Sequence, residues 1–217
     1  LENYIAGIRT VDDILITQGA QVETFGSDHG VLLVGDVNGS TCTITDKSTL
    51  VANQTGTTSY LGALQLMSTK LIVNNQSTVN ATIMNPSTDD MSFGITASFG
   101  IEVSGPSTTV RGNGGVGVHS NGTIQVSDGG KLYGTSDTYE YGQGVQGDRS
   151  GIKVYSGGLV EGTGVVYGVQ VTGADNTSRG IYVNNGELIG IATDNWIEAV
   201  GVNVDGENSN HLIVENN

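Results

Sequence analysis

Cysteine, basic residues and long apolar runs are scarce in this sequence of 217 residues. The single cysteine, Cys42, excludes a disulfide framework within one chain, and its place on a predicted strand favours a small buried side chain. Eight Lys and Arg face 22 Asp and Glu, a net charge of −14 that repels nucleic acids and anionic membranes. No apolar run reaches the roughly 18 residues of a membrane-spanning helix. We therefore expect neither a nucleic-acid partner nor membrane insertion.

Glycine is abundant instead, with 34 residues, and the apolar residues lean towards Val, Ile and Leu. This mixture favours a thin core shared by many short strands. The first residue is Leu rather than Met, so we expect either a fragment or a cell-surface protein whose signal peptide has been removed. Candidate N-glycosylation sequons occur at Asn38, Asn53, Asn75, Asn80, Asn121 and Asn176.

A repeat runs through the whole chain. A glycine followed by a small apolar residue recurs every 23 to 33 residues, starting near Gly7, Gly30, Gly62, Gly94, Gly117, Gly144, Gly168 and Gly201. Each unit then contains two apolar residues separated by one: Ile14/Ile16, Cys42/Ile44, Leu71/Val73, Ile101/Val103, Ile124/Val126, Ile152/Val154, Ile181/Val183 and Leu212/Val214. Alternation of this kind predicts short strands with one buried face.

A turn and a third apolar position follow most of these pairs. The turns are rich in Gly, Asn, Asp and Ser, which adopt tight turns readily. The third position is occupied by Val22, Leu50, Val79, Val110, Leu132, Val160 and Ile189. Val110 comes one residue late, which predicts a β-bulge beside Pro106.

These patterns together predict an all-β fold, a parallel β-solenoid of about seven to eight coils without a capping helix. Residues 1–217 form a single domain in this interpretation, with 23 to 33 residues in each coil. Strands of successive coils would pair in parallel about 4.8 Å apart, with their inward side chains stacked in columns.

The columns offer no convincing catalytic group, so we expect no enzyme activity. The residue between the two apolar residues of each pair should point outward. Its chemical type varies from coil to coil, which is typical of a solvated strand face: Leu15, Thr43, Ile72, Glu102, Gln125, Lys153, Tyr182 and Ile213. The three histidines (His29, His119 and His211) fall in different coils without ligand spacing. No cofactor is expected except calcium, for which the weak candidate ligands are Asp12, Asp13, Asp89, Asp90, Asp205 and Glu207.

A polysaccharide is the main candidate ligand on the strand faces. Tyr133, Tyr155 and Tyr182 belong to three consecutive coils and could stack on sugar rings, although tyrosines also brace neighbouring strands. Arg149 and Arg179 share a column and could contact an acidic sugar. The alternative for this pair is a surface ion-pair patch with the nearby acidic residues.

The first and last coils are the candidate self-association surfaces. Stacking the last coil of one copy on the first coil of the next would pair Leu212 with Ile14, Ile213 with Leu15 and Val214 with Ile16. His211 would then face Asp13. Such a head-to-tail contact between copies produces rings or open filaments.

The G-V-x-V, I-x-V and S-G-G-x-L-x-G units resemble those of β-helical cell-surface proteins of bacteria and archaea, which include adhesin-like, envelope sheath and surface-layer proteins. The resemblance covers the whole chain but is architectural. More loosely, the acidic, Gly-, Asn- and Thr-rich composition looks like that of the amyloid-like sheath proteins of filamentous methanogens. This class implies an extracellular location, no catalysis and assembly into tubes or fibres.

We therefore expect a non-enzymatic extracellular structural protein of the cell envelope that self-assembles into filaments, hoops or a sheath-like layer. The first alternative is a carbohydrate-binding adhesin module. A polysaccharide lyase or hydrolase, whose known members resemble this architecture, is the second alternative, and a trimeric phage-fibre fragment is the third.

Overall fold

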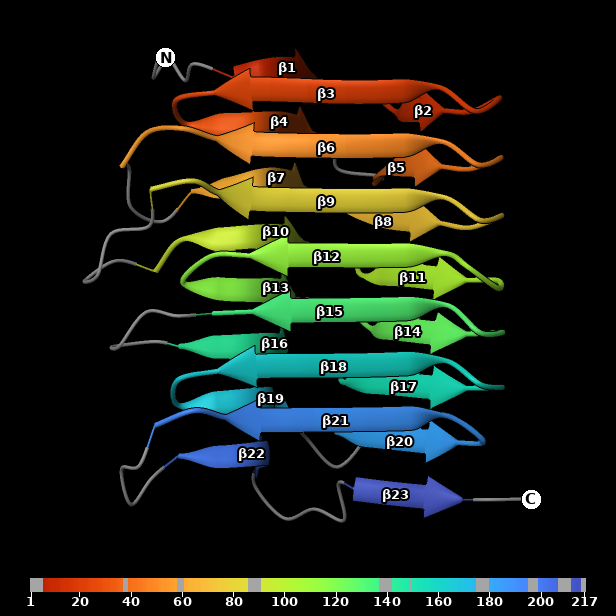
Figure 1. Cartoon of the computed structure of the whole chain (residues 1–217), viewed down its shortest axis with the longest axis vertical. Coiled ribbons are helices and arrows are strands. Elements are labelled where there is room, and N and C mark those ends of the chain that lie inside the picture. Colours follow the sequence, from red (N-terminus) through yellow and green to blue (C-terminus); the bar gives the residue numbers. More distant parts are fainter. Residues whose placement is uncertain are drawn as a thin grey trace.

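The described part of the chain forms β-strands and no helix in the structure, a computed structural model (Figure 1). The structure describes residues 6–36, 39–57, 61–85, 91–136, 142–148, 150–174, 180–194, 199–206 and 212–215. None of these residues belongs to a helix that could cross a membrane.

The strands form three parallel sheets, here named A, B and C. Sheet A contains β1 (Ala6–Thr10), β4 (His29–Val34), β7 (Gly62–Met67), β10 (Phe93–Ala97), β13 (Val116–Ser120), β16 (Gln143–Gly147), β19 (Tyr167–Ala174) and β22 (Val200–Gly206). Sheet B contains β2 (Ile14–Ile16), β5 (Ser40–Ile44), β8 (Thr69–Val73), β11 (Ile101–Ser104), β14 (Ile124–Ser127), β17 (Ile152–Tyr155), β20 (Ile181–Asn184) and β23 (Leu212–Glu215). Sheet C contains β3 (Gln21–Gly26), β6 (Thr49–Gln54), β9 (Thr78–Ile83), β12 (Thr109–Asn113), β15 (Lys131–Thr135), β18 (Leu159–Gly164) and β21 (Glu187–Ala192).

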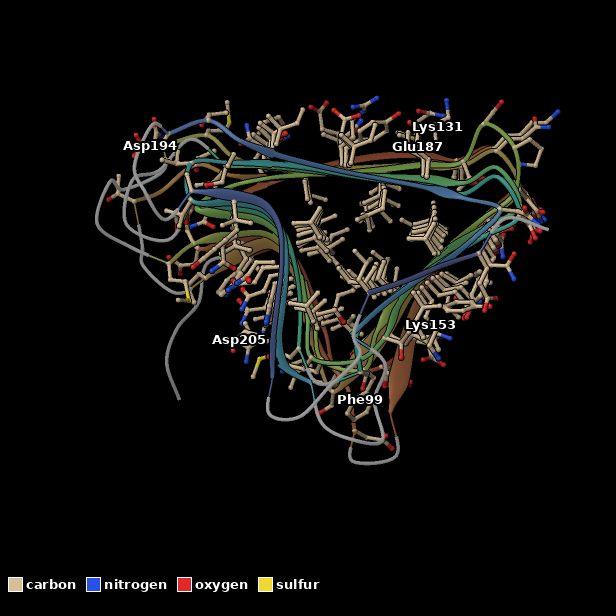
Figure 2. The ribbon with its side chains drawn as sticks, turned by 90° about the horizontal axis from the view of Figure 1, so that it is seen from below. Phe99, Lys131, Lys153, Glu187, Asp194 and Asp205 are labelled. Atoms are coloured by element: carbon tan, nitrogen blue, oxygen red, sulfur yellow. The ribbon has the colours of Figure 1, made fainter. Side chains whose placement is uncertain are left out.

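One strand from each sheet makes one coil, so the predicted parallel β-solenoid is confirmed. The 23 strands of the described residues make seven complete coils and two strands of an eighth. Seen end-on, the three sheets enclose a triangular cross-section with stacked side chains inside (Figure 2). The outer faces of all three sheets are therefore available to carry function.

The paired apolar motif forms the core column of sheet B. Every predicted pair is in register with the pair in the next coil, from Ile14/Ile16 to Leu212/Val214. The predicted burial of Cys42 is confirmed, and desolvation by burial raises the pKa of its thiol to about 12. Stacking of like apolar side chains along the axis thus supplies a core that one coil could not form alone.

The predicted register needs three corrections. The glycines that begin each repeat stack in a column along the solenoid. In the third coil Ala63, and not Gly62, lies in this column, because Leu64 pairs with both Val31 and Ile95. Leu188 rather than Ile189 follows Val160 in the core column of sheet C, since the preceding turn is one residue shorter.

The third correction concerns the β-bulge predicted beside Pro106. Strand β12 pairs with β9 and β15 in unbroken register around Val110. The extra residue lies in the turn between Ser104 and Thr109 instead, where Ser107 adopts a positive φ of 62°. A turn can absorb an additional residue without breaking the ladder of hydrogen bonds on either side.

Glycines let sheets A and C approach closely at their shared corner. A Cβ added to Gly144 of β16 would lie 2.6 Å from the carbonyl carbon of Gly162 and 2.6 Å from the carbonyl oxygen of Gly168. Real Cβ atoms essentially never make contacts this short. Backbone therefore packs on backbone at this corner, and sheet A bends close to it (Figure 2).

Candidate functional site

The outer face of sheet A carries two rows of polar residues that lie beside a hollow. One row passes through Thr96, His119, Gln146, Gln170 and Asn203 in five successive coils. A second row lies two residues further along the chain and contains Asn121 and Asp148, just after β13 and β16, and Thr172 within β19. Because side chains alternate along a strand, residues two positions apart share this outer face.

A chain of polar contacts connects four coils across this face. The hydroxyl of Thr96 lies 3.2 Å from Nδ1 of His119, and Nε2 of His119 lies 3.4 Å from Oδ2 of Asp148. The hydroxyl of Thr172 donates a hydrogen bond of 2.8 Å to Oδ1 of Asp148. The carboxylate of Asp148 is consequently held from both sides.

An aromatic contact fixes the imidazole further. The ring of Phe93 lies 5.2 Å from the ring of His119, centroid to centroid, at an interplanar angle of 35°. With Thr96 at one nitrogen and Asp148 at the other, the ring of His119 has a single well-defined orientation. It lies against Asp148 on the same outer face.

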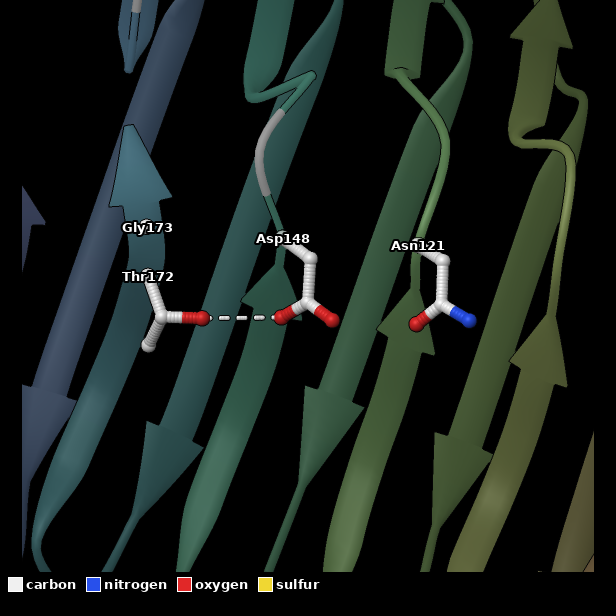
Figure 3. Close-up of a pocket in the computed structure, with 4 residues that line it drawn as sticks. All are labelled: Asn121, Asp148, Thr172 and Gly173. Carbon is white, nitrogen blue, oxygen red and sulfur yellow. Dashed lines mark hydrogen bonds between the residues drawn. The ribbon is translucent and has the colours of Figure 1, made fainter. Parts of the chain in front are cut away.

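A hollow of about 590 Å³ opens beside this chain of contacts. Its described lining consists of Asn121, Asp148, Thr172 and Gly173, which come from three successive coils (Figure 3). An amide, a carboxylate and a hydroxyl offer both donors and acceptors, whereas Gly173 presents no side chain. This arrangement can bind a ligand rich in hydroxyl groups.

A buried amide oxygen lies on the same face as the hollow. Gln170 alternates with core residues Val169 and Val171, so its side chain belongs to the outer face, where it is only 7% exposed. Its Oε1 atom has no hydrogen-bond partner among the described residues. Buried polar atoms are usually paired, so this oxygen is suited to an ordered water or a ligand hydroxyl.

The tyrosines predicted to bind glycans lie on two different faces. Tyr155 and Tyr182 approach each other on sheet B, with 5.5 Å between ring centroids. The hydroxyl of Tyr182 donates a 2.7 Å hydrogen bond to Glu215. Tyr133 lies on sheet C, where the guanidinium of Arg111 stacks 4.0 Å from its ring centre. The three tyrosines therefore cannot form one platform, and Arg149 and Arg179 lie outside the described residues.

The candidate calcium ligands are not assembled into one site within the described ranges. Asp12 accepts a hydrogen bond from the backbone of Asp13, whose own carboxylate accepts one of 2.6 Å from the backbone of Thr41. Asp205 lies on β22, at the opposite end of the solenoid from both. Across the described chain no three His, Cys, Asp or Glu side chains gather to hold a metal, and Asp89, Asp90 and Glu207 lie outside it.

The histidines have separate environments. His29 is buried on β4 with Nδ1 2.9 Å from the carbonyl oxygen of Gly62, and burial lowers its pKa. His119 belongs to the polar face described above. His211 lies outside the described residues.

The described sequons occupy three kinds of position. Asn53 and Asn80 lie on sheet C, in β6 and β9. Asn75 lies in a turn and donates hydrogen bonds to Thr45 and Asp46. Asn121 lines the hollow, whereas Asn38 and Asn176 lie outside the described residues.

The predicted self-association residues lie at the two ends of sheet B. Its outermost described strands are β2 and β23. Leu15 is 66% exposed, and Leu212 and Val214 are 54% and 62% exposed. Ile16 is buried, while Ile14 and Ile213 are half-buried. The carboxylate of Asp13 accepts a hydrogen bond from the backbone of Thr41 in the same chain. His211, its expected partner in the next copy, lies outside the described residues.

Comparison with known protein families, with curated proteins and with solved structures found no match. The sequence analysis did not identify the polar rows of sheet A. Each row takes one residue from each coil, and these residues are 23 to 33 positions apart in the sequence. The sequence does contain a signal for the first row. A polar residue directly follows three successive Gly-Val units, and these residues are His119, Gln146 and Gln170.

Proposed function

We propose that this protein is a non-enzymatic structural protein of the cell surface whose copies stack end to end. The edges of sheets A and B in one copy would continue those of the next and produce filaments, hoops or a layer. The acidic surface, the sequons and the absence of disulfides are compatible with an exported repeat protein that draws its stability from stacking.

The observation that carries the proposal is the exposure of core-column residues at the edge of sheet B. Leu212 and Val214 occupy the same columns as Ile152 and Val154, which are fully buried two coils away. A further coil placed on β23 would cover both side chains and complete the column. Burial of the exposed part of each side chain would contribute roughly 1 kcal/mol.

The opposite edge presents compatible side chains. Ile14, Leu15 and Ile16 of β2 have the same spacing as Leu212, Ile213 and Val214 of β23. Parallel pairing of these two strands would continue the register found in every interior coil. Because the two surfaces differ, the contact is heterologous and can propagate.

A single substitution tests the proposal. Val214→Lys places a charge in the apolar contact and should shift assemblies of the purified protein to monomers in sedimentation velocity. Met84→Lys is the matched control, since Met84 is 54% exposed in an interior coil and the charge added is the same. Equal assembly of both variants, or a wild-type protein that stays monomeric at high concentration, would overturn the proposal.

A further inference from the structure

We infer that the outer face of sheet A binds a neutral glycan chain that lies along the axis of the solenoid. The glycan would contact Asn121, Asp148 and Thr172 in the hollow at the end of β13, β16 and β19. This binding function is separate from the proposed stacking of copies, because the hollow lies on the side of the rod and the stacking surfaces lie at its ends.

The spacing of the polar groups favours a repeating ligand. Successive coils place an amide, a carboxylate and a hydroxyl side by side, separated by the distance between paired strands, about 4.8 Å. A glycan repeats hydroxyl groups along its length and can engage several coils at once. Gly173 leaves room beside Thr172, within a hollow of about 590 Å³.

The site is held rigid before any ligand arrives. Thr172 fixes one oxygen of Asp148, and His119 lies 3.4 Å from the other. His119 is itself held by Thr96 and Phe93. A preorganised site loses little conformational entropy on binding, so a few hydrogen bonds suffice for measurable affinity.

Buried polar atoms on the same face supply an independent indication. Gln170 is more than nine-tenths buried, two residues before Thr172 on β19, and its Oε1 atom has no partner among the described residues. A buried acceptor of this kind needs an ordered water or a hydroxyl from outside the chain. A hydroxyl-rich ligand beside Thr172 would meet that need.

Charge selects a neutral glycan over an acidic one. The chain carries a net charge of −14, and the described lining of the hollow includes the carboxylate of Asp148. A polyanion would be repelled by both. The carboxylate of Asp148 can instead accept hydrogen bonds from neighbouring hydroxyl groups of a sugar ring.

Isothermal titration with neutral hexasaccharides tests this inference. The probes are cellohexaose, laminarihexaose, mannohexaose and xylohexaose, with hexagalacturonate as the acidic comparator. We expect saturable binding of at least one neutral probe, weakened about tenfold or more by Asp148→Asn and by Thr172→Val, because each removes one charge-assisted or hydroxyl hydrogen bond. Asp128→Asn is the matched control, since Asp128 lies in a turn between sheets B and C.

Three outcomes would overturn the inference. They are the absence of binding to all four neutral probes, binding of hexagalacturonate alone, and neutral binding that Tyr182→Ala abolishes while Asp148→Asn leaves it unchanged. The last result would place the glycan on sheet B. Titration of Val214→Lys in parallel separates this inference from the proposed stacking, because glycan binding should persist in a variant that no longer assembles.

Discussion

Glycine residues decide how closely two sheets can approach in this molecule. Gly144 lies where the backbones of sheets A and C meet, and a methyl group there would collide with main-chain atoms that cannot move independently. We expect Gly144→Ala to lower the free energy of unfolding by about 2 to 3 kcal/mol. Urea denaturation followed by circular dichroism measures this change.

Ala63 provides the control for that prediction because it occupies the same column in the third coil. Ala63→Gly removes a methyl group that the structure already accommodates, so we expect a cost of about 1 kcal/mol. A Gly144→Ala variant as stable as the wild type would contradict the close approach of the two backbones.

Cys42 illustrates how burial controls chemistry at the same scale. Its thiol is buried in the core column of sheet B, and burial raises its pKa to about 12. A thiol-specific reagent at pH 8 should therefore modify the unfolded protein within minutes and leave the native protein intact. Rapid modification of the native protein would show that the coil opens readily at β5.

The same pKa predicts a pH dependence of stability. An unfolded cysteine has a pKa of about 8.5, so the folded state holds the thiol proton more tightly. The resulting stability is complete below about pH 8.5 and is lost as the pH rises towards 12. The free energy of unfolding should fall more steeply above pH 9 in the wild type than in Cys42→Ala, and parallel curves would contradict this account.

At the scale of elements, the turns between sheets B and C are tied to one another along the axis. The hydroxyl of Thr17 donates a 2.6 Å hydrogen bond to Asp46, and Asn75 donates one of 3.3 Å to the same carboxylate. These contacts join three coils. The hydrogen bond from Thr17 is the main cause that lowers the pKa of Asp46.

Asp46 therefore makes the turns sensitive to acid. A carboxylate whose pKa is lowered on folding stabilises the native state above its unfolded pKa of about 3.9 and loses that effect as the pH falls below it. The wild type should lose more stability than Asp46→Asn between pH 5 and pH 2, when thermal melts are recorded across the series. Thr17→Val should make this loss smaller, because it removes the main cause of the lowered pKa of Asp46, and identical acid profiles for all three proteins would refute the turn contact.

The sequence predicts the elements well where one repeated unit explains them. The paired apolar motif identifies the inward residues of sheet B in all eight coils, because alternation and stacking impose the same rule on each strand. The correction at Leu188 arises where a turn is one residue shorter, which a fixed offset cannot detect. The correction at Ala63 arises where an alanine takes the repeated position and the glycine of the motif comes one residue before it. The chain of polar contacts from Thr96 to Thr172 could not be predicted, because it depends on side-chain rotamers in four coils.

At the scale of the whole molecule, charge opposes the proposed stacking. A net charge of −14 makes copies repel one another at low ionic strength. Salt shortens the range of this repulsion to about 10 Å at 0.1 M, while apolar contacts at the ends persist. Assembly measured by light scattering should therefore increase from 10 to 300 mM sodium chloride, and a decrease would indicate that ion pairs hold the copies together.

The central claim is that copies of this solenoid continue one another's sheets, and electron microscopy of the purified protein at neutral pH tests it most directly. The account predicts filaments, hoops or layers in which each subunit extends the strand stack of the last, and predicts their loss in Val214→Lys but not in Met84→Lys. Isolated rods one subunit long at every protein and salt concentration would contradict it.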